Sequence, residues 1–418
     1  MLVIIPPILA GCGRTSEQVA LAGSLLSDRA SRPARVIPVR VQTAALSKPA
    51  EPCTNTFIAH DLNHTTSAGG VVKMYESNGA GLGIGDLDGD GKLDIVLANL
   101  TGGNTILWNE GNFHFRKTIL DDGPSRGVNV VDVDGDGWLD IVFTHSTTAP
   151  TYWHNTGRTG NAVHFVQESL PGIDERSYAM TWGDPHGAGR LDAVAGSYDV
   201  DLEQTYGFQF MHFRDGGGVY YYENRGDTFD STRLAEKSEA LAISFADLNQ
   251  DGKPYILVGN DFSALDQAWQ QANGGWQEAH PFSVITHSTM SFDLGDIDNS
   301  GYPALFATDM KPYDQSVRTL AEWRPMMERI PHDTFIGDSQ IMENVLQVRD
   351  RSGVYHNEAY ARSLDATGWS WSAKFGDLDN DGRLDLYVVN GMLAADLFDY
   401  LPGHELVEEN RAFQNQGD

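Results

Sequence analysis

The sequence predicts an all-β fold, a β-propeller of six or seven four-stranded antiparallel blades. Three observations support this prediction. An Asp- and Gly-rich unit recurs along the chain, short strand-like segments follow its copies, and the 44 glycines among 418 residues suit a fold with many tight turns. A hydrophobic content of 41% is enough to build a sizeable core.

The recurring unit is best formed at residues 85–94, with the sequence GDLDGDGKLD, and the apolar run 95–97 follows it. Its copies begin at Asp86, Asp132, Asp184, Asp247, Asp296 and Asp377. The first, second and last copies are complete, and the other three are degenerate. Successive copies begin 46, 52, 63, 49 and 81 residues apart. All but the last interval are close to the length of one propeller blade.

The segments after each unit are typical of paired β-strands. In the first repeat, the apolar run 95–97 is followed by residues 105–111, which end in Asn and Gly, and by the aromatic segment 113–115. Similar strand-like segments occur at 219–224 and 343–347. Short strands separated by turn signals predict hairpins, and two hairpins make one four-stranded antiparallel blade.

We expect three parts in the chain: a lipoprotein-type signal peptide over residues 1–12, a flexible tether over 13–54 and the propeller over 55–418. The long fifth interval indicates an insertion near 312–341. The last blade is expected to be incomplete, because residues 410–418 resemble the beginning of another strand that ends in Asn and Gly.

Two interpretations of the incomplete blade are open. A strand near residues 56–60 completes the ring, which would remove exposed sheet edges, or the sequence is a fragment of a longer protein.

The two cysteines, Cys12 and Cys53, cannot provide a disulfide framework for a fold of this size. Cys12 ends the run Leu9-Ala10-Gly11-Cys12, which follows a short apolar stretch and resembles a bacterial lipobox. The basic residue that usually precedes such a stretch is missing. Two interpretations of this are open: the true start lies upstream, or the match to a lipobox is a chance one. On the basis of the lipobox-like run, we expect an exported protein of the bacterial cell envelope or surface, or otherwise a secreted one. We expect it to contact a membrane only through lipidation at Cys12.

Acidic residues outnumber basic ones by 58 to 29, which gives a formal net charge of −29. This excess argues against nucleic acid or an anionic membrane as the main partner.

The complete units have the donor pattern of a calcium loop. In the first unit, carboxylates stand at the first, third, fifth and ninth positions, namely Asp86, Asp88, Asp90 and Asp94, and the backbone carbonyl of Lys92 is available at the seventh. Hard oxygen donors in this number suit Ca²⁺ better than Mg²⁺, which requires a tighter octahedron. An EF-hand is excluded, because its loop has twelve residues, a closing Glu and flanking helices.

The predicted ligands are the same positions of each complete unit, with two weaker sets in degenerate units. They are Asp86, Asp88, Asp90, Lys92 and Asp94; Asp132, Asp134, Asp136, Trp138 and Asp140; Asp377, Asp379, Asp381, Arg383 and Asp385; Asp247, Asn249 and Asp251; and Asp296, Asp298 and Ser300. In the weaker sets Tyr255 and Ala304 replace the closing carboxylate. The unit at Asp184 is expected to be empty.

These units resemble FG-GAP/VCBS repeats, the calcium-binding blades that integrin α-subunit propellers also contain. The phrases at residues 258–262, 307–310 and 368–373 resemble bacterial relatives of the cartilage acidic protein family, which often carry a C-terminal ASPIC/UnbV segment. The resemblance covers roughly residues 55–418. It implies an extracellular or surface-bound calcium-binding propeller, and fold alone does not decide its function.

Three classes of function are compatible with the sequence. We expect a binding, adhesion or scaffold module, acting as a monomer on an extracellular protein or polysaccharide, with structural calcium and no catalytic activity. The alternative is a carbohydrate-active enzyme of the polysaccharide lyase or sugar dehydratase type, and a purely structural surface protein is the third class. An enzyme would draw its acid, base and anion-binding groups from His145, His154, Tyr198, His212, Arg214, Tyr220 and His287.

Overall fold

The structure is a computed structural model that describes residues 58–121, 123–160, 162–200, 202, 217–262, 264–329 and 339–417. The predicted signal peptide and tether, with both cysteines, lie outside the described residues. In the part of the chain that is described, no helix is long and apolar enough to cross a membrane.

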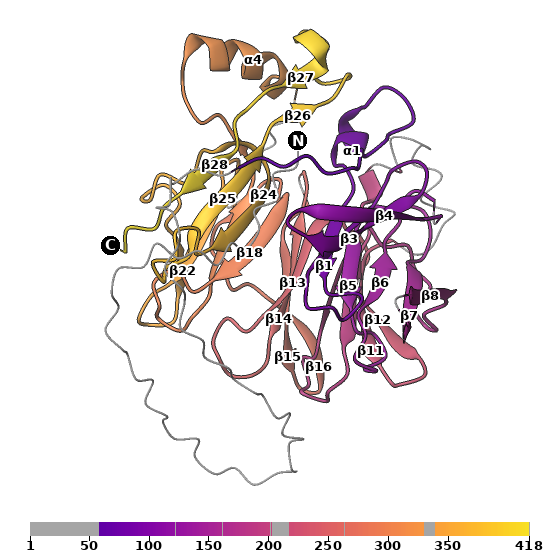
Figure 1. The fold of residues 1–418 in the computed structure, drawn as a ribbon. Coiled ribbons are helices and arrows are strands. Elements are labelled where there is room, and N and C mark those ends of the chain that lie inside the picture. Colours follow the sequence, from indigo (N-terminus) through magenta and orange to yellow (C-terminus); the bar gives the residue numbers. More distant parts are fainter. Residues whose placement is uncertain are drawn as a thin grey trace.

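Six four-stranded sheets follow one another in chain order (Figure 1), which confirms the predicted propeller blades. Blade 1 contains β1 (Leu82–Gly85), β2 (Asp94–Leu97), β3 (Asn104–Gly111) and β4 (His114–Leu120). Blade 2 contains β5 (Val128–Val131), β6 (Asp140–Phe143), β7 (Thr151–Thr159) and β8 (Ala162–Glu168). Blade 3 contains β9 (Ala179–Gly183), β10 (Asp192–Gly196), β11 (Val219–Asn224) and β12 (Phe229–Ala235).

The second half of the chain continues the pattern. Blade 4 contains β13 (Ala240–Ala246), β14 (Tyr255–Asn260), β15 (Gln267–Ala272) and β16 (Gly275–Ala279). Blade 5 contains β18 (Ser291–Gly295), β19 (Ala304–Thr308), β22 (Val345–Arg349) and β23 (Tyr355–Asn357). Blade 6 contains β20 (Met310–Lys311), β24 (Gly368–Gly376), β25 (Asp385–Asn390) and β28 (Arg411–Phe413), in that spatial order.

Blade 6 differs from the others in its strand order. The strands β24, β25 and β28 pair with one another in chain order. The fourth strand, the short β20, comes earlier in the chain and pairs with the edge of β24 that faces away from β25. The segment near residue 410 therefore forms the third strand of a blade, as the Asn-Gly signal indicates. In the described part of the N-terminal region, residues 58–60 form no strand, and His60 stacks on Phe113 of blade 1 at 4.3 Å.

The core lies between neighbouring blades and not inside one layer. The second strands β2, β6, β10 and β19 are buried along their whole length. Alternating side chains of adjacent blades meet in separate clusters, such as Val96, Ile106, Ile141 and Phe143 between blades 1 and 2. This layered burial is typical of a propeller, in which each sheet packs face to face on the next.

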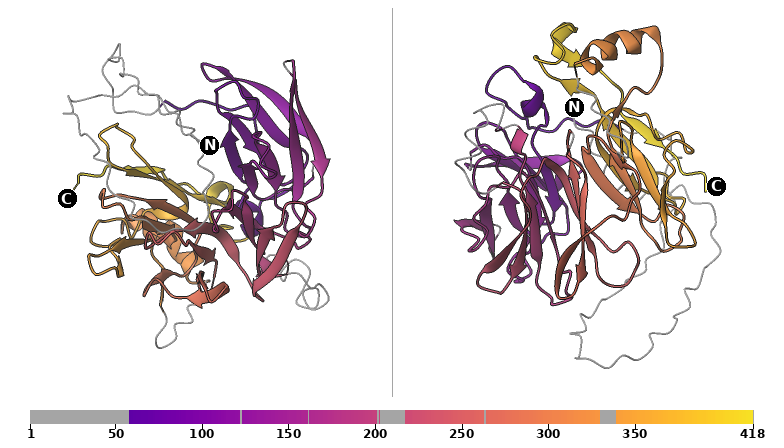
Figure 2. Two further views of the ribbon diagram at one scale, coloured as in Figure 1. Left: turned by 90° about the horizontal axis from the view of Figure 1, so that it is seen from below. Right: turned by 180° about the vertical axis from the view of Figure 1, so that it is seen from behind.

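The inner strands approach closely because several of their residues are glycines. A Cβ on Gly85 would stand 2.7 Å from Val130 and 2.8 Å from Leu139 of blade 2. Figure 2 shows the blades arranged around a common axis from indigo to yellow. A cavity of about 540 Å³ lies at this axis, and inner-strand residues of all six blades line it.

Small elements cover one end of the molecule. They are α1 (Met74–Ser77), β17 (Ile285–Thr286) paired with β21 (Gln340–Ile341), α4 (Val317–Met327), β26 (Met392–Leu393) paired with β27 (Glu405–Leu406), and a 3₁₀ turn at Pro402–His404. Helix α4 lies within the predicted insertion. Its Trp323 and Met326 are buried against Trp369 and Phe398, so this segment packs above blade 6 (Figure 1).

Candidate metal centre

The Asp-rich units form the loops between the first and second strands of the blades, for example between β1 and β2. A buried apolar residue stands at the second position of several of these loops, namely Leu87, Val133, Leu248 and Ile297. Hydrogen bonds also join loops to neighbouring blades: Asn155 Nδ2 donates to the Leu87 carbonyl at 2.9 Å, and the Tyr355 hydroxyl donates to the Leu248 carbonyl at 2.9 Å. The loops are therefore part of the packing between blades.

In the first loop, the three leading carboxylates converge. Asp86, Asp88 and Asp90 each place a carboxylate oxygen within 4.8 Å of the others. Asp86 folds the loop by accepting the N–H groups of Asp90 at 3.0 Å and Gly91 at 2.9 Å. The Lys92 ammonium pairs with Asp90. This pairing lowers the pKa of the Asp90 carboxyl, chiefly through the hydrogen bond from Lys92.

The second loop has the same shape and an additional imidazole. Asp132, Asp134 and Asp140 bring carboxylate oxygens within 4.8 Å of one another, and Asp134, Asp136 and His154 form an overlapping group of the same size. His154 Nε2 lies 3.1 Å from Asp134 Oδ2. The backbone N–H of Trp138 donates to Asp136 Oδ1 at 2.8 Å.

The last loop repeats the arrangement. Asp377, Asp379 and Asp385 form the third all-carboxylate group within 4.8 Å. Asp377 accepts the N–H of Asp381 at 2.9 Å, and the Arg383 guanidinium lies 3.1 Å from Asp381 Oδ2. All three complete units thus bring carboxylates together, and their spacing fits a hard divalent cation that accepts several oxygen ligands.

The carboxylate at the ninth position also accepts backbone hydrogen bonds that connect the loop to the third strand of the blade, a structural role that was not predicted from the sequence. Asp94 is buried, accepts the N–H of Leu87 at 3.1 Å, and accepts the N–H of Asn109 on the third strand at 2.8 Å. Asp140 accepts the corresponding N–H groups of Val133 and Asn155. Burial raises the pKa of the Asp94 and Asp140 carboxyls to about 6. These residues therefore tie the loop to the blade.

The Asn residues that contact the closing carboxylates were not among the predicted site residues. Asn109, Asn155, Asn224 and Asn415 each begin an Asn-x-Gly triplet, and each donates its backbone N–H to the closing Asp of its blade. The Asn oxygen in turn accepts the N–H of the Gly, for example Gly157 at 3.1 Å. The triplet is visible in the sequence, and it is the signal that could have identified them.

The degenerate loops at Asp247 and Asp296 fold in the same way as the complete ones but lack the carboxylate at the ninth position. Asp247 accepts the N–H groups of Asp251 and Gly252, with Asn249 beside them. In the fifth loop, Asp296, Asp298 and Ser300 make the same bonds. Among the described residues, neither loop supplies one of the carboxylate groups that could hold a metal ion.

The loop at Asp184 is different again. Asp184 accepts the N–H groups of Ala188 and Gly189, and the Tyr221 hydroxyl donates to Asp192 at 2.5 Å. His186 contacts this hydroxyl at 2.9 Å. Tyr152 makes the same kind of bond to Asp140 in the second loop at 3.1 Å. What distinguishes the loop at Asp184 is that it is absent from the metal-compatible groups found among the described residues. The prediction that it is empty stays a prediction.

The candidate catalytic residues are distributed over several blades. His145 contacts the Pro124 carbonyl at 2.6 Å and Thr151 Oγ1 at 3.0 Å, which holds its ring between blade elements. His154 lies on β7 with its side chain beside the second loop, and His287 follows the short strand β17. His212 and Arg214 lie outside the described residues.

The two tyrosines among these candidates are buried. The Tyr198 hydroxyl donates to Asp261 Oδ2 at 2.6 Å. Burial, followed by the charge of Asp261, raises the pKa of Tyr198 well above its ordinary value. Tyr220 stacks on Tyr222 with ring centres 6.0 Å apart. Both side chains thus have clear packing roles.

Comparison with known proteins supports the repeat assignment. A model of the FG-GAP-like repeat matches residues 86–143 and 247–307, which include the first, second, fourth and fifth loops. No curated protein sequence matches the chain.

Two solved structures are similar in outline. The Bap1 biofilm matrix protein of V. cholerae is 17% identical, with a TM-score of 0.34, and the match covers 66% of this chain and 38% of that one. This chain therefore spans well under half of that protein. A protein from Lactobacillus plantarum is 12% identical, with a TM-score of 0.41, over 79% of this chain and 84% of that one.

The fold assignment depends on the strand order, the loops and the matched repeats. The chain is a six-bladed β-propeller with FG-GAP-like repeats.

Proposed function

We propose that this protein is an exported propeller whose Asp-rich loops bind Ca²⁺ and which acts as a binding or scaffold module for an extracellular protein or polysaccharide. The observation that carries the proposal is the convergence of carboxylates at equivalent positions of three blades, around Asp88, Asp134 and Asp379. Carboxylate oxygens in flexible loops are ligands that Ca²⁺ prefers.

Calcium would supply the charge balance that these loops lack. At about 4 Å and an effective dielectric constant near 20, each pair of carboxylates repels by about 4 kcal/mol before relaxation. Among the described residues, Asp88 and Asp134 form no ion pair with a Lys or Arg side chain; the titratable His154 lies beside Asp134, and Lys92 pairs with Asp90 instead. A divalent cation would remove this repulsion and hold the first strand of a blade to the second. The folded state alone assembles the site, so calcium would stabilise it.

A binding role is favoured over catalysis by the state of the candidate base Tyr198. Its hydroxyl is buried and donates to Asp261, so forming a phenolate there is unfavourable. A lyase of the uronate type needs a base that reaches its substrate and can lose its proton. The acidic surface charge also favours partners that are not polyanions, or partners that are bridged by calcium.

One experiment separates the two classes of function. Purified protein with millimolar Ca²⁺ is incubated with a panel of neutral and anionic polysaccharides, and absorbance of unsaturated uronates and retention on the immobilised polymers are measured together. We expect retention of at least one polymer without products, and its loss in excess chelator. Turnover would contradict the binding proposal. Absence of both would direct the search to protein partners by crosslinking on intact cells.

A further inference from the structure

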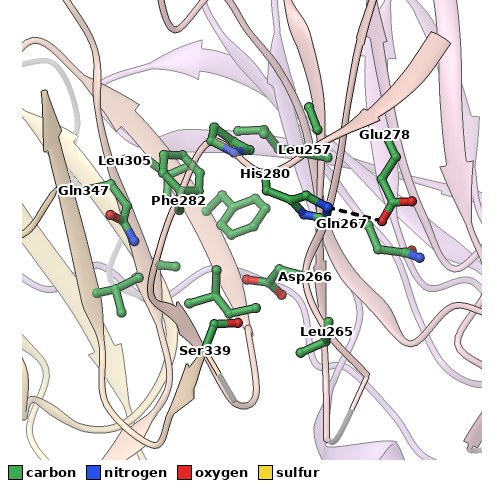
Figure 3. Close-up of a pocket in the computed structure, with 17 residues that line it drawn as sticks. Leu257, Leu265, Asp266, Gln267, Glu278, His280, Phe282, Leu305, Ser339 and Gln347 are labelled. Carbon is green, nitrogen blue, oxygen red and sulfur yellow. Dashed lines mark ion pairs between the residues drawn. The ribbon is translucent and has the colours of Figure 1, made fainter. Parts of the chain in front are cut away.

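A second cavity lies between blades 4 and 5 (Figure 3), away from the Asp-rich loops. Its volume is about 170 Å³, and its wall is largely apolar, formed by residues such as Leu257, Phe282, Phe292 and Leu305. This volume is close to that of an engineered apolar cavity of about 150 Å³ that binds benzene. The cavity therefore has room for one small ring or a short alkyl chain.

A carboxylate lies in this apolar wall. Asp266 immediately precedes β15, and Figure 3 shows its side chain directed into the cavity. Its Oδ1 accepts the N–H of Asn260 at 2.8 Å, and the hydroxyl of Thr289 donates to the carboxylate at 2.9 Å. These bonds, with a further side-chain hydrogen bond from Thr286, fix the position of the carboxylate.

The other blades show that the fold does not require an acid at this position. Asn104, Asn344 and Asn410 stand at the same place, at the beginning of the third strand of blades 1, 5 and 6. Each accepts a backbone N–H at the end of the second strand, at 2.9, 2.8 and 3.0 Å.

The amide nitrogen then donates to a hydroxyl of the next blade. Asn104 donates to Ser125 Oγ at 2.9 Å, and Asn344 donates to Thr367 Oγ1 at 2.7 Å. In blade 4 the direction is reversed, because the Thr289 hydroxyl donates to Asp266. Asparagine therefore satisfies the equivalent backbone group and can bridge a blade to the next one, and the choice of an acid at position 266 needs a different explanation.

The surroundings of Asp266 favour a positively charged ligand. Glu278 lies at the exposed rim and is 3.9 Å from His280, the only basic group among the residues that line the cavity. The side-chain oxygen of Gln267, which also lines the cavity, is buried and has no hydrogen-bond partner among the described residues. A buried acceptor without a donor is costly, and a ligand N–H group would satisfy it.

We propose that the cavity between blades 4 and 5 binds a small organic amine, with its apolar body against Phe282 and Leu305 and its ammonium group on Asp266. The apolar wall supplies affinity through buried area. The ion pair and the Gln267 oxygen supply selectivity for an amine over a neutral molecule of the same shape.

Benzylamine and toluene test this proposal, because they share a ring and differ in the ammonium group. Binding of each is measured by saturation-transfer NMR titration on wild-type protein, on Asp266→Asn and on the rim variant Glu278→Gln, all with calcium present. We expect Asp266→Asn to weaken benzylamine binding by about tenfold or more and to leave toluene binding unchanged. Glu278→Gln should change benzylamine binding by less than about threefold, because an exposed charge contributes little.

The asparagine variant is a matched control, since three other blades carry Asn at this position. Its melting temperature, measured in parallel, should remain within a few degrees of wild type, and benzylamine should raise the melting temperature of wild type only. Equal benzylamine affinity in wild type and Asp266→Asn would overturn the proposal. So would the failure of the folded wild-type protein to bind benzylamine at millimolar concentration.

Discussion

The side-chain amide of Asn155 in blade 2 donates a hydrogen bond of 2.9 Å to the backbone carbonyl of Leu87 in blade 1. The same amide contacts the carbonyl of Leu139 in its own loop at 3.0 Å. Asn415 repeats this bridge from blade 6 to the carbonyl of Ile297 in blade 5 at 2.7 Å. The Asp-rich loops are therefore joined across blade boundaries, and their stability is coupled to the packing of the ring.

Replacing Asn155 with Ala should destabilise the protein by about 2 to 4 kcal/mol, because the buried carbonyl of Leu87 and the partly buried carbonyl of Leu139 lose their donor. Asn109 is the matched control. It makes the corresponding bond to Leu93 within its own blade at 3.0 Å, and it is only partly buried. Asn109→Ala should lower the free energy of unfolding by about 1 kcal/mol. Urea denaturation in chelator measures both, and equal losses would argue against a bridge between blades.

Calcium stoichiometry tests the ranking of the loops. Isothermal titration of chelator-treated protein should give three tight sites per chain. Asp134→Asn should reduce the number to two, because it removes a carboxylate from the second cluster. Asp184→Asn should leave three, because the loop at Asp184 lacks converging carboxylates. A fall in stoichiometry with Asp184→Asn would show that this loop is occupied.

The close approach of inner strands predicts a cost for added volume. Gly85→Ala places a methyl group 2.7 Å from Val130 and 2.8 Å from Leu139, and it should destabilise the protein by about 1 to 3 kcal/mol. Gly275→Ala in β16 is the control, because nothing lies within 4 Å of its added Cβ. It should be neutral or slightly stabilising. Thermal unfolding of both variants decides whether blade packing sets this difference.

The protonation of the Asp266 carboxyl should contribute to the pH dependence of the free energy of unfolding. Burial raises the pKa of Asp266 to about 7, despite the hydrogen bonds from Asn260 and Thr289. The folded state therefore holds a proton that the unfolded state has lost between about pH 4 and 7, so the stability from this group is full at low pH and declines across that range. Asp266→Asn should make the decline smaller and be more stable than wild type at pH 8, by about 1 to 2 kcal/mol after allowance for partial solvent access. The part of the decline that comes from the raised pKa values of Asp94, Asp140 and Asp309 should remain.

Denaturation at pH 5 and pH 8, at constant calcium, checks this prediction. Glu278→Gln at the exposed rim should keep the wild-type pH profile. A pH profile of Asp266→Asn that matches wild type would mean that this carboxyl is ionised in both states.

The fold and the loop positions were predictable because they depend on local sequence. The pattern around Asp88, Asp134 and Asp379 fixes a turn, its spacing gives the blade length, and the apolar runs after it become the buried second strands. The third strand of the last blade was also predictable, since β28 is followed by an Asn-x-Gly triplet at Asn415 that corresponds to those in β3 and β7.

The contacts between distant segments were not predictable in the same way. The closing carboxylates pair with their Asn partners at separations of 15, 15, 32 and 30 residues, so no fixed spacing reveals them. The role of Asp266 depends on which residue begins a third strand and on which hydroxyl of the next blade lies opposite. Equivalent positions of different blades can be compared only when the strand pairing within each blade is known.

The most direct test of the central claim is thermal unfolding of the protein in millimolar Ca²⁺ and in excess chelator. If the Asp-rich loops hold calcium, the chelator should lower the melting temperature by several degrees or more, and added Ca²⁺ should restore it more completely than Mg²⁺. An unchanged melting temperature would contradict the claim that calcium in these loops stabilises the propeller.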